Sequence, residues 1–459
     1  MITPSTYHGK TVAVLGLGKS GLTAARALKS AGATVLAWDD KEAGRQLLSN
    51  LVLQAVDLNI ADWSKIDCLV MSPGIPHTYP VPHPVSDMAR AAGCPIICDV
   101  ELLIQAQPNA KYIAITGTNG KSTTTALIAH VLNVAGCEVQ VGGNLGIPVL
   151  DLEPLNEDGI YVLEMSSYQL ERTPSLVPDV AVLLNITPDH LDRHGGMAGY
   201  IAAKKNIFNA QSAEQFCVIG VDDEHCLNIF NEQIKTSLAK CIPISAKGCV
   251  ENGVFSDEDI LIDEAFSDEG EQVMDLSSLQ TLPGSHNQQN AATAYAACIA
   301  IGASPEWIVR GIASFPGLEH RQELVDVFAG VTFVNDSKAT NSDAAAKALG
   351  SYDNIYWIAG GQAKEGGIDG LRDQLSGVHK AYLIGEAEAA FAQTLDGKIE
   401  YELCQTLEAA TKAAFKDASL NGGVVLLSPA CASWDQFDSF EARGNTFKEI
   451  VYSLIEEAA

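Results

Sequence analysis

Residues 112–125 read YIAITGTNGKSTTT, and the order of their physical properties is informative. Tyr112–Ile115 is a short apolar run that predicts a buried strand, and the segment from Lys121 predicts a helix that reaches about Ala135. Between them, residues 117–122 form a glycine-rich turn whose backbone N–H groups can hold phosphates. The stretch therefore predicts a nucleotide-binding α/β domain.

This loop carries the chemistry of an ATP site, although the strict GxxxxGK[ST] pattern is incomplete because position 115 is Ile rather than Gly. Lys121 can reach the β- and γ-phosphates, and the hydroxyl of Ser122 can ligate Mg²⁺. A chance Gly-Lys-Ser turn is the weaker alternative.

A second glycine loop, GLGKSG at residues 16–21, follows the predicted strand Thr11–Leu15 and opens a predicted helix. Asp39 and Asp40 come after the next predicted strand, Thr34–Trp38, which is the context of a dinucleotide-binding fingerprint. Taken alone, the loop suggests an NAD enzyme. A glycine turn without a ligand is an equal alternative, and a third is another pyrophosphate, such as that of a UDP-sugar.

Short runs rich in Val, Ile and Leu alternate with alanine-rich segments of helical length along the chain. This alternation predicts βαβ units and parallel sheets, and no repeat of 20–50 residues accompanies it. At ~150 residues per domain, 459 residues suggest three domains, which we place at residues 1–99, 100–317 and 318–459. Further strands are predicted at Cys68–Met71, Gly159–Leu163, Val180–Ile186, Phe216–Ile219, Val331–Val334, Ile355–Ala359, Ala381–Ile384 and Val424–Leu427, and a buried helix at Ser285–Ile301.

The chain carries 29 Lys and Arg against 57 Asp and Glu, so its formal net charge is −28. Such a surface repels nucleic acid and anionic membrane, and neither is an expected partner. The N-terminus lacks the pattern of a secretory signal, and the longest near-apolar stretch, Ala291–Ala303, is too short to span a bilayer. We expect a cytoplasmic protein without membrane insertion.

Two local compositions stand apart. Nine acids and no Lys or Arg lie between Glu251 and Glu271, which predicts a solvated hairpin or loop pair.

The eleven cysteines are odd in number and often lie in apolar runs, which indicates reduced core residues. Cys94 and Cys98 could pair or bind a metal, but no second Cys/His pair lies nearby.

Charged residues follow two predicted strands of the second predicted domain, residues 100–317, at the sheet edge where ligands bind in α/β proteins. Glu164 ends the run Ile160–Leu163, and His190 lies in the loop after Val180–Ile186. Beside a nucleotide loop, both predict Mg²⁺ ligands, with an exposed strand-end charge and a structural histidine as the alternatives.

Three more polar segments are informative only in part. Lys204 and Lys205 lie on a predicted helix, and their spacing alone indicates a solvated face. The loops Asp336–Asn341 and Ser428–Asp435 each follow a predicted strand, so we expect them to line one cleft.

Together these motifs resemble the Mur ligases, the ATP-dependent amino-acid ligases of peptidoglycan precursor synthesis. TGTNGKSTTT at residues 116–125 is similar to the family's ATP loop, which folylpolyglutamate synthases share. EMSSYQL at 164–170, GLGKSG at 16–21 and SPACASWDQF at 428–437 are similar to the D-glutamate-adding branch of the family. The DNPR-type motif of the diamino-acid-adding branch is absent. The resemblance runs from about Lys10 to the C-terminus, except for residues 251–271.

The resemblance implies an α/β fold of three domains: a Rossmann-like N-terminal domain that binds the UDP substrate, a central P-loop ATPase domain, and a Rossmann-like C-terminal domain that binds the amino acid. It reassigns residues 16–21 from NAD to the UDP part of UDP-N-acetylmuramoyl-L-alanine, with Asp39 near the uracil. The implied contacts to this substrate are Gly18, Lys19, Ser20, Asp39, Ser72, Gly74 and Asn144.

For ATP, the resemblance implies contacts from Gly117, Thr118, Asn119, Gly120, Lys121, Ser122, Thr123, Asn287, Asn290, Arg321, Asp336 and Lys338. Two Mg²⁺ ions would be held with Ser122, Glu164, His190 and Lys204, and Lys121, His190 and Lys204 would act in catalysis. Lys204, in the pattern YIAAK, matches the family's carbamylated lysine, and Lys205 is the competing assignment.

The implied pocket for D-glutamate consists of Thr340, Lys364, Ser433 and Phe440. Gln362 stands where an acidic residue is frequent in the family, which bears on the orientation of Lys364. The implied reaction transfers the γ-phosphoryl group of ATP to the L-alanine carboxylate, and the amine of D-glutamate then attacks the acyl phosphate.

Two other classes of function remain open at this level. One is a nicotinamide-dependent oxidoreductase built on GLGKSG, which phosphate release without NAD would exclude. The other is a non-catalytic nucleotide-binding regulator, which turnover would exclude. For the ligase that the resemblance implies, we expect a monomer.

Overall fold

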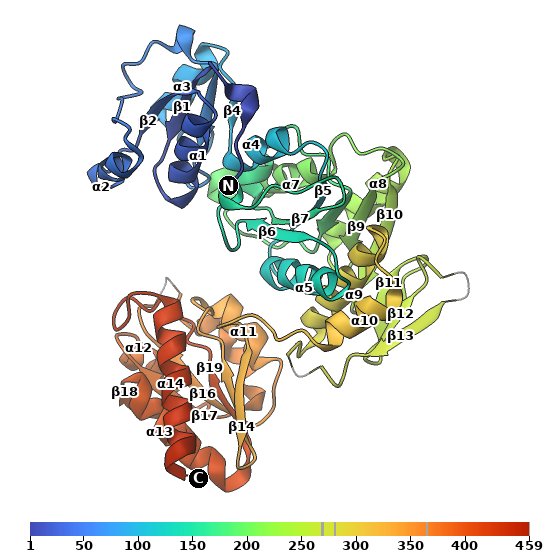
Figure 1. The fold of residues 1–459 in the computed structure, drawn as a ribbon. Coiled ribbons are helices and arrows are strands. Elements are labelled where there is room, and N and C mark those ends of the chain that lie inside the picture. The colour runs from blue at the N-terminus through green and yellow to red at the C-terminus, as the bar shows by residue number, and fades with distance from the viewer. Residues whose placement is uncertain (268–269, 280, 364–365, 459) are drawn as a thin grey trace. The chain divides into compact units, whose positions relative to one another are not determined.

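The computed structural model describes residues 1–267, 270–279, 281–363 and 366–458 (Figure 1). It divides into two compact units, the first made of Met1–Leu276 with Gln289–Ser314 and the second of Ser277–Gln288 with Phe315–Ala459. The first unit holds two sheets and the second holds one. All three sheets are mainly parallel and are covered by helices, so the predicted α/β class is confirmed.

The first sheet has the strand order β2-β1-β3-β4, and all of its pairs are parallel. Its strands are β1 (Thr11–Leu15), β2 (Thr34–Trp38), β3 (Cys68–Met71) and β4 (Ile96–Ile97), with helices α1 (Lys19–Ser30), α2 (Glu42–Gln46) and α3 (Pro84–Ala91). The first three strands begin and end where the sequence predicts. Because β1 is paired on both sides and covered on both faces, its apolar residues are fully buried.

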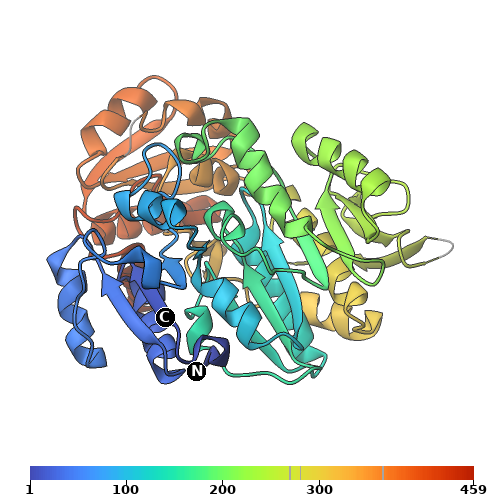
Figure 2. The ribbon, with the colours of Figure 1, turned by 90° about the horizontal axis from the view of Figure 1, so that it is seen from above.

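The second sheet has nine strands in the order β13-β12-β11-β10-β9-β8-β5-β7-β6. Its parallel strands are β5 (Lys111–Thr116), β6 (Val139–Gly143), β7 (Ile160–Glu164), β8 (Val180–Leu183), β9 (Phe216–Gly220) and β10 (Lys240–Ser245). The helices are α4 (Asp99–Ala106), α5 (Lys121–Val134), α6 (Ser167–Leu170), α7 (Met197–Lys205), α8 (Glu224–Thr236), α9 (Ser285–Ala300) and α10 (Pro305–Ala313). Figure 1 shows α5 and α7 on opposite sides of β5 and β7, and Figure 2 shows the strands from above.

The acidic segment forms a hairpin, as predicted, but the prediction that it is solvated is wrong for one of its faces. β11 (Val254–Asp257) and β12 (Ile260–Asp263) are antiparallel, and β13 (Glu271–Asp275) pairs with β12. Phe255 and Leu261 are buried, and the buried carboxylate of Asp263 accepts a hydrogen bond from the hydroxyl of Tyr295 at 3.1 Å. The exposed acids Asp257, Glu258 and Asp259 are consecutive at the turn between β11 and β12, and the residues of β11 before them are buried.

The second unit contains one six-stranded sheet in the order β14-β15-β19-β16-β17-β18. The strands are β14 (Glu323–Phe328), β15 (Val331–Asn335), β16 (Ile355–Gly360), β17 (Val378–Ile384), β18 (Glu400–Gln405) and β19 (Gly423–Leu427), and only β14 is antiparallel to its neighbour. The helices are α11 (Ser342–Leu349), α12 (Glu388–Leu395), α13 (Leu407–Asn421) and α14 (Phe440–Ala458). Trp357 and Tyr356 belong to different apolar clusters, one for each face of the sheet.

The cysteines are all unpaired, which excludes a disulfide between Cys94 and Cys98. Within the described part of the chain, no cluster of three or more His, Cys, Asp or Glu side chains could hold a metal on its own, so the cysteine-metal alternative is also wrong. Both thiols are buried, and burial raises their pKa values to about 11. None of the described helices has the length and apolar character of a bilayer span.

Candidate active site

The glycine loop of the second sheet lies between the end of β5 and the start of α5. Gly117 and Gly120 adopt φ values of +156° and +85°, which a residue with a side chain rarely adopts. A Cβ atom on Gly120 would lie 2.6 Å from Oδ1 of Asn290, so the packing also requires glycine there. No side chain caps the N-terminus of α5, and its first turn contains no acid. The loop therefore presents an uncapped helix N-terminus, which suits an anion.

Polar contacts hold this loop in place from the neighbouring strand. The backbone N–H of Asn119 donates to Oδ1 of Asn185 at 2.8 Å, and the side-chain amide of Asn185 donates to the carbonyl oxygen of Asn119 at 3.1 Å. The hydroxyl of Thr124 donates to Oδ1 of Asn290 at 3.0 Å. The loop, the start of α5 and Asn290, which the resemblance implies as an ATP contact, are thus parts of one hydrogen-bonded region.

Two lysines converge on the carbonyl oxygen of Gly117. Nζ of Lys121 donates to it at 2.9 Å and also to the carbonyl oxygen of Thr118 at 2.7 Å. Nζ of Lys204, from α7, donates to the same Gly117 oxygen at 2.8 Å. Lys204 is only 2% exposed, so its predicted solvated position is wrong. Burial, together with the nearby Lys121 cation, holds the pKa of Lys204 well below its ordinary value.

The competing residue, Lys205, lies in a different environment. Its side chain is 30% exposed, and its Nζ pairs with the carboxylate of Glu232 at 2.7 Å. Of the two lysines, Lys204 is the one in contact with the glycine loop, through the carbonyl oxygen of Gly117.

Glu164 ends β7 and lies opposite Ile115 of β5 in the register of the sheet. Its Oε1 accepts a hydrogen bond from the side-chain amide of Asn144 at 2.8 Å. Its Oε2 is buried and accepts no hydrogen bond from the residues that the structure describes. Because Glu164 is buried, the alternative of an exposed strand-end charge is wrong. A buried carboxylate oxygen without a partner beside a phosphate loop fits a Mg²⁺ ligand.

His190 begins the 3-10 turn Leu191–His194 and adopts a left-handed conformation, with φ of +52°. Its side chain is 57% exposed, so the alternative of a packed structural histidine is wrong for this residue. The histidine with a structural role is His194, which is buried and hydrogen-bonded to the hydroxyl of Ser167 at 2.9 Å. The rings of both histidines contact the ring of Tyr168.

The N-terminal glycine loop, residues 16–21, contains glycines that the packing requires and one, Gly18, that faces open space. A Cβ on Gly21 would lie 1.7 Å from the carbonyl oxygen of Gly16, whereas a Cβ on Gly18 would meet nothing within 4 Å. Gly18 is the N-cap of α1, followed by Lys19 and Ser20 in the first turn. The hydroxyl of Ser72 donates to the carbonyl oxygen of Gly16 at 3.0 Å. The space at Gly18 is thus available to a ligand at a helix N-terminus.

Asp39 binds this loop directly. Its two carboxylate oxygens accept hydrogen bonds from the backbone N–H groups of Leu17, at 2.6 Å, and Lys41, at 2.8 Å. The carboxylate therefore shapes the glycine loop, whereas in a dinucleotide fingerprint the acid binds a ribose hydroxyl.

In the second unit, Asp336 follows β15 and is buried. Its Oδ2 accepts a hydrogen bond from the hydroxyl of Ser428 at 2.7 Å, and its Oδ1 accepts one from the backbone N–H of Gln322 at 3.2 Å. Burial raises the pKa of Asp336 to about 7. The loops that follow β15 and β19 therefore meet, as expected from the order of the strands.

A second set of contacts links residues predicted for ATP and for D-glutamate. Nζ of Lys338 lies 3.8 Å from the centre of the Phe440 ring, and the hydroxyl of Ser337 donates to the carbonyl oxygen of Phe440 at 2.8 Å. Thr340 lies two residues beyond Lys338, and Ser433 is 2% exposed in the loop after β19. Lys364 lies outside the described residues.

The ATP residues predicted from the sequence are divided between the two units. Residues 117–123 and Asn290 belong to the first unit, and Asn287, Arg321, Asp336 and Lys338 belong to the second. In the first unit, the contacts described above join the loop and the start of α5 to Asn290.

The sequence did not reveal two buried arginines. Arg443 of α14 donates to the hydroxyl and carbonyl oxygens of Ser337, both at 2.9 Å, and to the carbonyl oxygen of Cys431 at 3.0 Å. Arg172, after α6, donates to backbone carbonyls at the end of β3. Bonds from arginine to backbone carbonyls require no particular partner side chain, so no motif could indicate them.

Three family models match consecutive stretches of the chain. They are the Mur ligase MurD-like N-terminal domain at residues 10–98, the Mur ligase middle domain at 115–298 and the Mur ligase glutamate ligase domain at 320–431. A protein of Paramagnetospirillum magneticum named UDP-N-acetylmuramoylalanine–D-glutamate ligase is 52% identical over 462 residues, covering 100% of both chains. A protein of the same name from Caulobacter vibrioides is 51% identical over 99% of this chain and 98% of its own.

The chain belongs to the Mur ligase family. The resemblance that the motifs indicated is thereby confirmed, as is the organisation into three Mur ligase domains.

Solved structures share the Mur ligase fold. UDP-N-acetylmuramate-alanine ligase MurC from Thermotoga maritima aligns with a TM-score of 0.58 at 17% identity, covering 97% of this chain and 100% of that one. MurF from Acinetobacter baumannii aligns with a TM-score of 0.55 at 19% identity, covering 78% of this chain and 79% of that one. At these identities the likeness concerns the fold alone.

Proposed function

We propose that this Mur ligase is a UDP-N-acetylmuramoylalanine–D-glutamate ligase. It uses ATP to join D-glutamate to UDP-N-acetylmuramoyl-L-alanine, in the synthesis of peptidoglycan precursors. The observation that carries the proposal is the full-length match, at 52% identity, to a relative of that name. The open Gly18 at the N-terminus of α1 and the uncapped N-terminus of α5 support two phosphate-bearing substrates.

The chemical problem is that a carboxylate does not form an amide in water, because its oxygen is a poor leaving group. The γ-phosphoryl group of ATP is transferred to the L-alanine carboxylate, which gives an acyl phosphate and ADP. The amine of D-glutamate attacks the acyl carbon, the amide forms, and phosphate leaves. Lys121 moves from the carbonyl oxygens that it now binds to the transferring phosphoryl group and stabilises its charge.

The residues at the loop fit two Mg²⁺ ions. Ser122, Glu164 and His190, together with a carbamate on Lys204, would hold the ions, and phosphate oxygens complete the shell. Bound Mg²⁺ neutralises charge on the phosphates. The free Oε2 of Glu164 supports this assignment.

Carbamylation of Lys204 fits the observed environment of this side chain. The neutral amine attacks the carbon of CO₂, a proton is released, and an N-carboxylate remains. A lowered pKa supplies the neutral amine, and contact with Gly117 places the product beside the ATP loop. Carboxylate oxygens are ligands that Mg²⁺ prefers, whereas an ammonium group would repel it.

The remaining assignments complete the proposal. Gly18, Lys19, Ser20, Asp39, Ser72, Gly74 and Asn144 serve the UDP substrate, and Thr340, Lys364, Ser433 and Phe440 serve D-glutamate. The boundaries between the three domains lie at residues 99 and 317. The enzyme acts as a monomer in the cytoplasm.

The decisive experiment incubates the purified chain with UDP-N-acetylmuramoyl-L-alanine, ATP, Mg²⁺ and D-glutamate, followed by mass spectrometry of the product and phosphate measurement. One phosphate released for each amide formed, without NAD, supports the proposal. Product with another amino acid but not with D-glutamate would identify another branch of the family. Absence of turnover with intact ATP binding would favour a regulator.

A further inference from the structure

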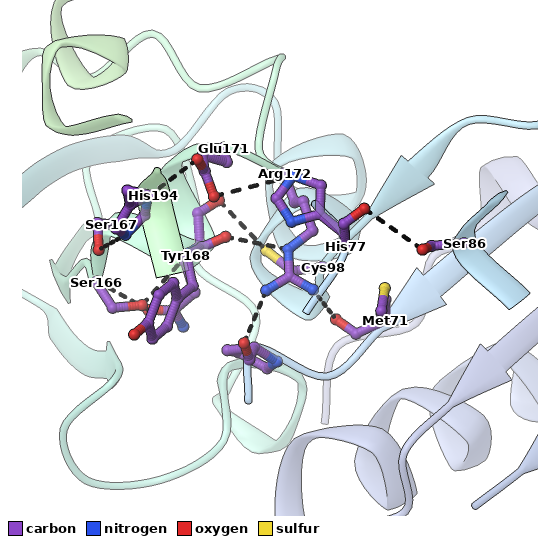
Figure 3. Close-up of polar contacts among 12 residues, drawn as sticks. Met71, His77, Ser86, Cys98, Ser166, Ser167, Tyr168, Glu171, Arg172 and His194 are labelled. Carbon is purple, nitrogen blue, oxygen red and sulfur yellow. Dashed lines mark hydrogen bonds and ion pairs between the residues drawn. The ribbon is translucent and has the colours of Figure 1, made fainter. Parts of the chain in front are cut away.

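Arg172 makes an unusual set of contacts between the first two sheets. It follows α6, and its side chain is 1% exposed. The guanidinium donates to three consecutive carbonyl oxygens at the end of β3: Met71 at 3.1 Å, Ser72 at 3.2 Å and Pro73 at 3.0 Å. Its Nε donates to the carbonyl oxygen of Tyr168 at 3.1 Å. Figure 3 shows the guanidinium extending from the α6 segment toward Met71.

These contacts do not form an ion pair. No carboxylate among the described residues lies within 4.0 Å of the Arg172 guanidinium. Removing an arginine from water is unfavourable, and an apolar side chain of similar size would avoid that cost. The four hydrogen bonds to backbone carbonyls fix the two segments relative to each other, which an apolar side chain would not do.

Two of the three carbonyls, those of Ser72 and Pro73, belong to the turn at residues 72–74, which is proposed to contact the UDP substrate, and the third ends β3 just before it. The hydroxyl of Ser72 also donates to the Gly16 carbonyl, so the turn is continuous with the N-terminal glycine loop. Fixing the turn therefore fixes both parts of the substrate site on this sheet.

A short segment that contains α6 connects Arg172 to Glu164. Ser166 and Gln169 form a capping box that stabilises α6, the single helical turn between Glu164 and Arg172. The distance from the proposed metal ligand to the arginine is thus set by a short, capped segment.

A second contact of the same turn comes from the loop that carries His190. Arg193 donates to the carbonyl oxygen of Gly74 at 3.0 Å. A Cβ on Gly195 would lie 2.8 Å from the ring of Tyr79, so the two segments pack closely. His194 joins the α6 segment through Ser167 and Glu171, at 2.9 and 3.2 Å (Figure 3).

We propose that Arg172 is a positioning residue for the L-alanine carboxylate of the UDP substrate, which accepts the phosphoryl group. It holds the turn at residues 72–74 at a fixed distance from Glu164 and the ATP loop, so that the substrate carboxylate meets the γ-phosphate. The inference rests on the proposed function.

The test compares Arg172→Met and Arg172→Lys with Arg90→Met as the matched control. Arg90 donates to the carbonyl oxygen of His77 in the same loop from the exposed side and pairs with Asp87. For Arg172→Met we expect kcat/KM for UDP-N-acetylmuramoyl-L-alanine to fall about 10- to 100-fold, the scale of a misplaced reactant, while KM for ATP changes less than about twofold. Arg172→Lys retains one donor group and should recover part of the loss, and Arg90→Met should behave as wild type.

Calorimetric binding of an ATP analogue shows that each variant is folded. If Arg172→Met disrupts folding, the kinetic comparison passes to Arg172→Lys, for which we expect a loss confined to the UDP substrate. Unchanged kcat/KM for that substrate, or an equal rise of KM for ATP, overturns the inference and leaves the proposed function intact. A wild-type chain that forms no product overturns the proposed function itself.

Discussion

The side-chain amide of Asn144 donates a hydrogen bond to Oε1 of Glu164 at 2.8 Å. The backbone N–H of Asn144 also donates to the carbonyl oxygen of Glu164, at 2.8 Å. A residue assigned to the UDP substrate is therefore bonded twice to a residue assigned to Mg²⁺. The pairing leaves Oε2 of Glu164 as the buried oxygen without a hydrogen-bond donor.

This arrangement predicts how Glu164→Gln behaves. Glutamine keeps the shape and can still accept the bond from Asn144, but it removes the charge that would attract Mg²⁺. We expect turnover to fall at least about 10²-fold, the scale of losing one charge contact in the transition state, and the Mg²⁺ dependence to shift to higher concentration. Glu153→Gln, at a largely exposed acid, is the control. An unchanged Mg²⁺ titration of Glu164→Gln would contradict the assignment.

Lys121 gives a second prediction. Its ammonium group binds the Gly117 and Thr118 carbonyls, and in the proposed reaction it would stabilise the phosphoryl group. Lys121→Ala should keep the fold and lower turnover at least about 10²-fold. Lys235→Ala, at an exposed position of α8, should have no effect. Steady-state phosphate release checks the rates, and circular dichroism checks the fold. Near-normal turnover of folded Lys121→Ala would refute the ATP-loop assignment.

The two adjacent lysines of α7 give a third prediction, with one serving as the control for the other. Lys204→Ala should lose most activity, and a short carboxylic acid should restore part of it by replacing the carbamate. Lys205→Ala should retain activity, because its side chain is partly exposed and paired with Glu232. The measurement is turnover with and without added acid. If Lys205→Ala shows the loss and the rescue instead, the assignment is displaced by one residue.

The sequence predicted the elements of the fold that have strong local patterns. The strands at 11–15, 34–38 and 68–71 have the bounds that the sequence predicted. Those at 11–15 and 68–71 are inner strands buried on both faces and are therefore continuous apolar runs, and the edge strand at 34–38 has a similar run although it is partly exposed. Edge strands such as β13 and β18 lacked this signal, since one of their faces is exposed. The burial of the acidic hairpin depends on its packing against Tyr295, a contact that local composition cannot indicate.

The same distinction applies to the site. The loop of Lys121 has a spacing that identifies it, and the resemblance to a family extended the prediction to Lys204, whose own spacing indicated a solvated face. Arg172 and Arg443 could not be found, because they bind backbone carbonyls of segments distant in sequence.

Asp336 predicts a pH-dependent stability. Burial raises the pKa of its carboxyl from an ordinary value of 3.8 to about 7. Below about pH 4 the Asp336 carboxyl is protonated in both the folded and the unfolded state. Between the two pKa values it is protonated only in the folded state, so the free energy of unfolding falls as the pH rises. At roughly 1.4 kcal/mol per pH unit, the loss approaches about 4 kcal/mol near pH 7.

Urea unfolding between pH 4 and 8 measures this effect, with Asp336→Asn as the comparison. The amide cannot ionise, so the variant should lose less stability than the wild type over the same interval. Parallel pH profiles for the two proteins would show that Asp336 is ionised in the folded state.

Thr340 and Ser433, which we propose for the acceptor pocket, lie on loops of the second unit that Arg443 connects through Ser337 and Cys431. One alternative is that Thr340 and Ser433 only cap helices. The N-cap of α11 is Asn341, whose side chain accepts from Ala344, and Ser439 accepts from Ala442 at the start of α14. The helix-capping positions are therefore filled by other residues, which supports a ligand-binding role for both hydroxyls.

D-Glutamate has two carboxylates and one amine, so its pocket must supply donors for the carboxylates and leave the amine free. Ser433→Ala removes one buried donor and should raise KM for D-glutamate about tenfold, near the loss of one hydrogen bond to a charged group, with KM for ATP unchanged. Ser419→Ala, at an exposed hydroxyl of α13, is the control. Because loops fix the two carboxylates relative to each other, D-glutamate should be used in strong preference to L-glutamate. Equal use of L-glutamate, or an effect of Ser433→Ala confined to ATP, would place the acceptor site elsewhere.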